Sequence, residues 1–257
     1  MWFQLKSYFH FLRRSTNHHG VHSPFVFELL TKCLYDKKHY PQYSVIDAYQ
    51  KRLLSNTEII EVCDFGAGSK VFRSNYRKVA DIAKNAGISS KRAKMLFRIC
   101  SYFDIQKVLE IGTSVGLATS AMAFARTNAS ITSAEGCNET AKVARAALEF
   151  APNVLVVTTE FSEFLNSENI QNAKFDLVYF DGNHQKEATL QYFQTLLPTV
   201  SNDTLWIFDD IHWSAGMEKA WAEIKQHPQV TVTVDTFQWG LVFFRKEQQK
   251  EDFVVRV

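Results

Sequence analysis

The sequence predicts a doubly wound α/β fold, in which helices cover a mostly parallel β-sheet. Short apolar runs alternate with helical segments from about Lys107 onwards, a pattern typical of a parallel sheet covered by helices. The last two apolar runs, 230–235 and 240–245, lie four residues apart. Because that gap is too short for a helical crossover, we expect these two strands to be antiparallel neighbours. The composition, with 46% hydrophobic and 22% charged residues, is that of an ordinary globular protein.

The elements of the sheet follow in order along the chain. Each short apolar run is a predicted strand, and each longer amphipathic or small-residue segment between two runs is a predicted helix. Asn138 is expected to cap the second of these helices. The predicted strands are 107–112, 130–135, 153–159, 174–181 and 203–210, followed by the closing pair, and the predicted helices are 117–125, 138–150, 185–197 and 214–226.

The N-terminal part of the chain does not alternate in this way. Residues 1–95 are predicted to form a helical cap or lid with one strand-like piece at 59–69, and residues 96–257 to form the sheet domain. The segment from Asp64 to Ser69 contains Gly66 and Gly68 around one alanine. Because glycine gives the backbone unusual freedom, we interpret the segment as a flap over the site, and an ordinary tight turn is the alternative.

The first helix of this cap has an aromatic face. Trp2, Leu5, Phe9 and Leu12 are spaced to share one side of it, with Lys6, Arg13 and Arg14 nearby. We expect this face to dock on the protein's own core or on a partner rather than on a membrane. A homodimer through the N-terminal aromatic helices remains open.

Charge and composition exclude several classes of protein. Lys and Arg number 29 against 27 Asp and Glu, which leaves a formal charge of +2. No block of one sign occurs, so a dedicated nucleic-acid binder is not expected. No run of 18 apolar residues is present, so no transmembrane segment is predicted. The four cysteines are scattered and form no C-x-x-C pair, which favours a reducing, cytoplasmic location.

A glycine-containing turn follows the first strand of the alternation. Glu110, Gly112 and Gly116 form the pattern E-x-G-x-x-x-G at the end of that strand. Glycines let the backbone approach a ligand, and a helix N-terminus offers N–H groups. Ser114 replaces the middle glycine of a dinucleotide fingerprint, which argues against an NAD-binding oxidoreductase. Glu135 ends the next strand, at a position where carboxylates bind ribose hydroxyls in nucleotide-binding α/β folds.

This pattern resembles the class I S-adenosylmethionine-dependent methyltransferases from about Ser89 to Arg245. The resemblance implies a Rossmann-like sheet of seven strands with the last strand antiparallel. It places Glu110 near the methionine end of the cofactor and Glu135 on the ribose. The cofactor-binding residues that it implies are Glu110, Gly112, Thr113, Ser114, Gly116, Glu135, Gly136, Phe161, Ser162 and Asp181.

A second group of polar residues follows the fourth and fifth strands. Asp181 ends the fourth strand, and Asp209 and Asp210 end the fifth. Neighbouring parallel strands place their C-terminal ends on one rim of the sheet. Three carboxylates gathered there favour a hard divalent cation, Mg²⁺, Mn²⁺ or Ca²⁺. Singly, Asp181 could be a turn residue and Asp210 a helix cap. His184 could be a general base, an outer-shell group or a cap of the following helix.

These residues resemble the divalent-cation-dependent O-methyltransferases of the catechol, caffeoyl-CoA and macrolide-sugar types. The resemblance implies Asp181, Asp209 and Asp210 as metal ligands, and Trp213 matches a tryptophan of those families. His184 stands where the catechol type has a lysine, which leaves the substrate class open. The sequence therefore predicts Mg²⁺-dependent transfer of a methyl group to a hydroxyl of a small molecule, with His184 and Asp181 as catalytic residues. The rivals are a metal-independent methyltransferase and a catalytically silent cofactor-binding module.

Overall fold

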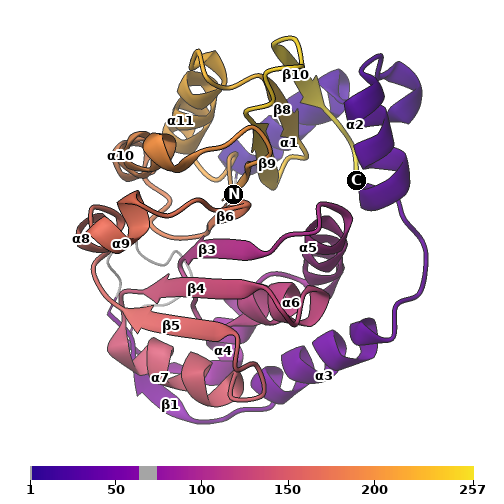
Figure 1. The fold of residues 1–257 in the computed structure, drawn as a ribbon. Helices are drawn as coiled ribbons and strands as arrows, with labels where there is room; N and C mark the ends of the chain where they lie inside the picture. The colour runs from indigo at the N-terminus through magenta and orange to yellow at the C-terminus, as the bar shows by residue number, and fades with distance from the viewer. Residues whose placement is uncertain (1, 64–73) are drawn as a thin grey trace. The chain divides into compact units, whose positions relative to one another are not determined.

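The computed structural model describes residues 2–63 and 74–257 (Figure 1). The chain divides into two compact units, the first formed by Met1–Tyr35 with Leu165–Val257 and the second by Asp36–Phe164. Residues 1–95, predicted as one cap, therefore contribute to both units. The proposed flap at Asp64–Ser69 lies outside the described residues.

The second unit contains three parallel strands. β3 (Lys107–Ile111) pairs with β4 (Ser130–Glu135), and β4 pairs with β5 (Val154–Thr158). Figure 1 shows them side by side in magenta and pink. β1 (Ile59–Glu61) and β2 (Tyr76–Lys78) form a separate antiparallel pair. The helices of this unit are α3 (Gln42–Leu54), α4 (Val79–Asn85), α5 (Ser90–Tyr102), α6 (Leu117–Ala125) and α7 (Asn138–Ala147), followed by α8 (Phe161–Leu165) at the boundary.

The first unit contains five strands. β6 (Leu177–Phe180) and β7 (Leu205–Asp209) are parallel, and β9 (Trp239–Phe243) is antiparallel to both β7 and β8 (Val232–Asp235). β10 (Glu251–Val254) adds a parallel partner to β8. Its helices are α1 (Trp2–Arg14), α2 (Pro24–Leu29), α9 (Glu168–Gln171), α10 (Lys186–Leu196) and α11 (Ala215–Gln226), with shorter turns at His18–Gly20, Leu30–Leu34 and Leu197–Thr199.

The predicted fold class is confirmed, with differences in detail. The second unit holds the parallel strands β3–β5, and the first holds the mixed strands β6–β10, so most strand pairs are parallel. The antiparallel strand is β9, as the short gap predicted, but the C-terminal β10 adds a strand that the resemblance does not imply. Asn138 is not a helix cap. Cys137 occupies the cap position in an extended conformation, and Asn138 is the first residue of α7.

Aromatic packing fixes the elements of the first unit. All five residues of β7 are buried, and the Phe208 ring stacks on Phe180 of β6 with ring centroids 4.2 Å apart. A Cβ on Gly240 of β9 would lie 2.7 Å from the Trp221 ring, so this glycine lets α11 pack directly on the strand. Among the described residues, no helix is long and apolar enough to cross a membrane.

Candidate functional site

Glu110 lies inside the sheet of the second unit and is fully buried. Its Oε2 atom accepts hydrogen bonds from the hydroxyls of Thr119 and Ser133. Its Oε1 atom is also buried and has no hydrogen-bond partner in the described part of the chain. Burial raises the pKa of Glu110 to about 7, although the two hydroxyls oppose the shift. An unpaired buried carboxylate oxygen is costly, so the site suits a ligand with a cationic donor.

The turn after β3 has an unusual backbone. Gly112, Ser114 and Gly116 have φ values of 98°, 50° and 80°, which lie in the left-handed region that favours glycine. The N–H groups of Gly112 and Thr113 both donate to the Ala134 carbonyl, at 2.9 and 3.1 Å. These two bonds attach the turn to the end of β4.

Glu135 holds the same turn from the other side. Its Oε2 atom accepts the N–H of Ser114 at 2.8 Å, and its Oε1 atom accepts the N–H of Cys137 at 2.9 Å. Burial raises the pKa of Glu135, while hydrogen bonds from the N–H groups of Cys137, Ser114 and Gly136 act in the opposite direction. Each carboxylate oxygen has a second lone pair, so Glu135 can still accept hydrogen bonds from a ligand.

Gly116 is required by packing as well as by its backbone angle. A Cβ at this position would lie 2.7 Å from the Tyr49 hydroxyl and 2.9 Å from a methyl group of Leu148. Tyr49, on α3, donates a hydrogen bond to the Val115 carbonyl at 3.0 Å. The turn is therefore clamped by a residue that sequence reasoning missed. Nothing in the sequence singles out Tyr49, because it is one tyrosine of a helix that contains no recognised motif.

Phe161 and Ser162, which the resemblance implies as cofactor-binding residues, begin α8 just after β5. Both side chains are half-buried. The preceding backbone runs beside the end of β4, where the N–H of Thr159 donates to the Glu135 carbonyl at 2.9 Å. The chain segment that leads to Phe161 therefore starts next to Glu135.

The first unit brings the predicted acidic residues to one rim. Phe180 of β6 is in register with Phe208 of β7, so Asp181 and Asp209 follow at equivalent positions on adjacent parallel strands. Asp209 is buried, and its Oδ1 atom accepts the N–H of Asp210 at 2.8 Å. The Tyr179 hydroxyl lies 3.4 Å from the other oxygen of Asp209.

Asp210 is not a helix cap. Ser214 caps α11, because its side chain accepts the N–H of Met217. Asp210 instead has a left-handed backbone with φ of 54°. Among the described residues, no three His, Cys, Asp or Glu side chains form a group that could hold a metal ion. In this conformation Asp181, Asp209 and Asp210 follow the ends of neighbouring strands, but they do not form a complete set of metal ligands.

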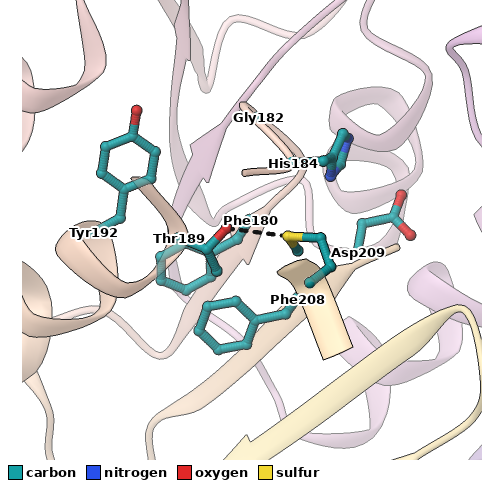
Figure 2. A pocket seen from close by; sticks show the side chains of 8 residues that line it. Phe180, Gly182, His184, Thr189, Tyr192, Phe208 and Asp209 are labelled. Carbon is teal, nitrogen blue, oxygen red and sulfur yellow. Dashed lines mark hydrogen bonds between the residues drawn. The ribbon is translucent and has the colours of Figure 1, made fainter. Parts of the chain in front are cut away.

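His184 faces the same rim. Its Nε2 atom lies 3.7 Å from Oδ1 of Asp181, which is too long for a hydrogen bond. It does not cap α10, since that cap position belongs to Gln185. His184 and Asp209 line one pocket, which Figure 2 shows with the Phe180 and Phe208 rings and the hydroxyl of Tyr192. This pocket combines aromatic walls with an acid and an imidazole.

Both ring nitrogens of His212 are occupied by carboxylate partners. Its Nδ1 atom lies 2.8 Å from Glu218 and its Nε2 atom 2.9 Å from Asp235. Burial lowers the pKa of His212, but hydrogen bonds and charge from Asp235 and Glu218 outweigh it and raise the pKa overall. Because both ring nitrogens are occupied, His212 links β7, α11 and β8 and is not a candidate base.

Comparison with known proteins identifies the domain. A family model described as a methyltransferase domain matches residues 109–211. This part of the chain is a methyltransferase domain. The match begins in β3 and ends just after β7, so it includes the turn at Gly112–Gly116, Glu135 and all three acids of the rim. None of the curated proteins compared with the chain matches it significantly.

Solved methyltransferases share the fold of this domain. An O-methyltransferase from Bacillus cereus, solved in complex with S-adenosylhomocysteine, is 17% identical with a TM-score of 0.54, and the match covers 86% of this chain and 97% of that one. The S-adenosylhomocysteine-bound methyltransferase PaMTH1 from Podospora anserina is 14% identical with a TM-score of 0.57, covering 82% and 99%. TomG, an O-methyltransferase from Streptomyces achromogenes involved in tomaymycin synthesis, is 14% identical with a TM-score of 0.55, covering 86% and 95%. At these identities the likeness shows the fold alone.

Proposed function

We propose that the chain is a Mg²⁺-dependent O-methyltransferase that methylates a hydroxyl of a small molecule. The observation that carries this proposal is the register of β6 and β7, which aligns Asp181 with Asp209 beside His184. A methyltransferase domain needs an acceptor site next to its sheet, and ligands of such folds bind at the carboxyl ends of the strands. The pocket lined by His184 and Asp209 lies at such an end.

The cofactor is assigned to residues of the second unit. Glu135 would accept hydrogen bonds from the ribose hydroxyls, and the buried oxygen of Glu110 would accept one from the cofactor's ammonium group. Backbone atoms of the turn from Gly112 to Gly116 would contact the cofactor. Gly136, Phe161 and Ser162 would also lie beside the cofactor. The unpartnered oxygen of Glu110 supports this assignment, because a cationic group would relieve its desolvation.

The acceptor is assigned to residues of the first unit. Asp181, Asp209 and Asp210 are the proposed ligands of a divalent ion, and bound Mg²⁺ would lower the pKa of the acceptor hydroxyl. His184 would take the proton of that hydroxyl at an imidazole nitrogen. The buried, stacked rings of Phe180 and Phe208 would keep water away from the rim beneath the acceptor.

Two finer expectations accompany this proposal. The scattered cysteines support a cytoplasmic location. The nearly balanced charge argues against a nucleic-acid acceptor, and the resemblance to the O-methyltransferases supports a small molecule. The division into a cap (1–95) and a catalytic domain (96–257) also remains a proposal. The rivals are the same transfer without a metal, in which the acids only orient the acceptor, and a silent cofactor-binding module.

The deciding experiment separates these three functions. The protein is dialysed against EDTA, and S-adenosylhomocysteine binding is measured by calorimetry while a metabolite library is screened by mass for the addition of one methyl group. Methylation that disappears with EDTA and returns with Mg²⁺ supports the proposal. Full activity in EDTA favours the metal-free rival. Cofactor binding with no methylated product under any condition favours the silent module.

A further inference from the structure

Helix α1 presents one apolar face, formed by Trp2, Leu5 and Phe9, to the outside. Trp2 is 81% exposed, Phe9 59% and Leu5 46%, whereas Ser7 and Phe11 are the buried residues of this helix. Docking on the protein's own core, one of the two expectations for this face, is therefore wrong for Trp2, Leu5 and Phe9, whereas Leu12 is half-buried. Isolated exposed apolar residues need no explanation, but a cluster on one helix marks an interaction surface.

These three residues form one continuous face. At about 100° per residue, Trp2, Leu5 and Phe9 fall within an arc of about 60° on the helix, on the side opposite Ser7 and Phe11. A 13-residue helix with this pattern has two apolar sides, of which one packs on the protein and the other does not.

The inner side fixes α1 in place. The Phe237 ring contacts the rings of Phe11 and Tyr8, with centroids 5.4 and 4.9 Å apart. Just after the helix, the N–H of Thr16 donates to the Val254 carbonyl at 2.9 Å. Because the C-terminal strand and Phe237 hold the helix in one orientation, the outward face is a fixed feature of the first unit.

The charge around this face has one sign. On the same helical geometry, Arg13 and Lys6 lie at the edge of the apolar arc. Residues 2–27 contain Lys6, Arg13 and Arg14 but no Asp or Glu, which leaves 26 basic against 27 acidic residues in the rest of the chain. In the described part of the chain these three residues make no ion pair. The positive charge therefore remains available to a partner.

We infer that α1 docks on an anionic lipid surface, with Trp2, Leu5 and Phe9 entering the boundary between headgroups and acyl chains. A helix with Trp, Phe and Leu on one face and flanking Lys and Arg matches the chemistry of that boundary. A second copy of the chain fits less well, because a symmetric contact through this face would bring Lys6 and Arg13 of both copies together. The attachment is peripheral, and the sheet remains outside the lipid.

The first test measures binding of the full chain to vesicles. Phosphatidylcholine vesicles with and without about one-third phosphatidylglycerol are compared by co-sedimentation, and the fluorescence of Trp2 reports its transfer from water. We expect binding to the anionic vesicles only, with a blue shift that is absent in Trp2→Phe although that variant still binds. High salt should weaken binding because it screens the basic residues.

Paired variants then locate the surface. Trp2→Ser with Phe9→Ser should weaken binding about tenfold or more, because each change removes a large apolar side chain from the boundary. Lys6→Glu with Arg13→Glu should weaken it at least about fivefold for each charge reversed. Leu155→Ser is the matched control, since Leu155 is 60% exposed on β5 in the other unit, and it should bind like the parent chain.

Three outcomes overturn the inference. They are equal binding to neutral and anionic vesicles, unchanged binding in both paired variants, and a stable dimer in solution that Trp2→Ser with Phe9→Ser converts to monomer. S-adenosylhomocysteine affinity is measured in every variant to show that the fold is intact. The inference does not depend on the metal or on the acceptor, so its failure leaves the proposed function untouched.

Discussion

The turn after β3 and the rim after β6 and β7 are organised in different ways. Backbone hydrogen bonds hold the turn in place, because the N–H groups of Gly112, Thr113 and Ser114 all bond to the end of β4. The rim is aligned by sheet register and aromatic stacking, and its acids do not form a closed set of ligands. On the proposed function, the first region is preorganised for the cofactor, whereas the second would be completed by the metal ion.

The proposed function accounts for this difference. A cofactor of constant structure favours a site whose geometry is fixed by the backbone, since preorganisation lowers the cost of binding. Carboxylates gathered at one rim repel one another until a cation neutralises them. We therefore expect substitutions at the rim to affect turnover, and substitutions at the turn to affect cofactor affinity and stability.

The largest effect is expected for Asp209→Asn at the rim. Asparagine keeps the size of the side chain and an acceptor for the N–H of Asp210, but it removes the charge that a divalent ion requires. Turnover should fall by roughly 10²- to 10⁴-fold, while S-adenosylhomocysteine affinity, measured by calorimetry, should change by less than about twofold because the site of the cofactor is elsewhere. Asp203→Asn is the control, because Asp203 is an exposed acid that pairs with Arg245 and its loss should leave turnover unchanged. If Asp209→Asn retains full activity, the acids of the rim have no catalytic role.

The next effect is expected for Glu135→Ala at the turn. This change removes the carboxylate that accepts the N–H groups of Ser114 and Cys137 and that we assign to the ribose. Cofactor binding should weaken by about 1.5–3 kcal/mol, the range for hydrogen bonds to a charged group. Calorimetry with S-adenosylhomocysteine measures it. Glu139→Ala, on the neighbouring α7, is the control, because Glu139 pairs with Lys142 at the surface. Equal affinities in the two variants would remove Glu135 from the cofactor site.

How far the sequence predicts each region depends on the kind of contact involved. Strand alternation correctly predicted that Asp181 and Asp209 end adjacent strands, since register follows from the hydrophobic pattern. The pattern E-x-G-x-x-x-G located the turn. The hydroxyls of Thr119 and Ser133 and the Tyr49 clamp were not predictable, because side-chain contacts between distant segments leave no periodic signal. For the same reason, the sequence left open whether the face of α1 docks on the core or on a partner: the spacing shows which residues share a face but not which way that face points.

A smaller effect tests the buried acid behind the turn. Because burial raises the pKa of Glu110 to about 7, the folded protein holds a proton that the unfolded chain releases near pH 4.5. Stability without cofactor should therefore fall as the pH rises from 5.5 to 7.5, by about 2 kcal/mol from this residue. In the Glu110→Gln variant the side chain stays neutral at every pH. The free energy of unfolding of this variant, measured with urea, should therefore lack the decrease of about 2 kcal/mol. If the free energies of unfolding of the parent chain and of Glu110→Gln change with pH in the same way, Glu110 is already ionised at low pH.

The smallest effect is expected for Tyr49→Phe, which separates the clamp from the glycine that it covers. The variant loses the hydrogen bond to the Val115 carbonyl and should be destabilised by about 1 kcal/mol. Gly116→Ala should cost more in the parent chain, because its Cβ would lie 2.7 Å from the Tyr49 hydroxyl and its φ of 80° strains any side chain. In the Tyr49→Phe background the same substitution should cost less, since that hydroxyl is gone while the strain at φ and the Leu148 contact remain. A double-mutant cycle from urea unfolding measures this coupling, for which contacting residues give about 0.5 kcal/mol or more. A coupling of zero would mean that Tyr49 does not press on Gly116, and the turn would then depend on its bonds to Ala134 and Glu135 alone.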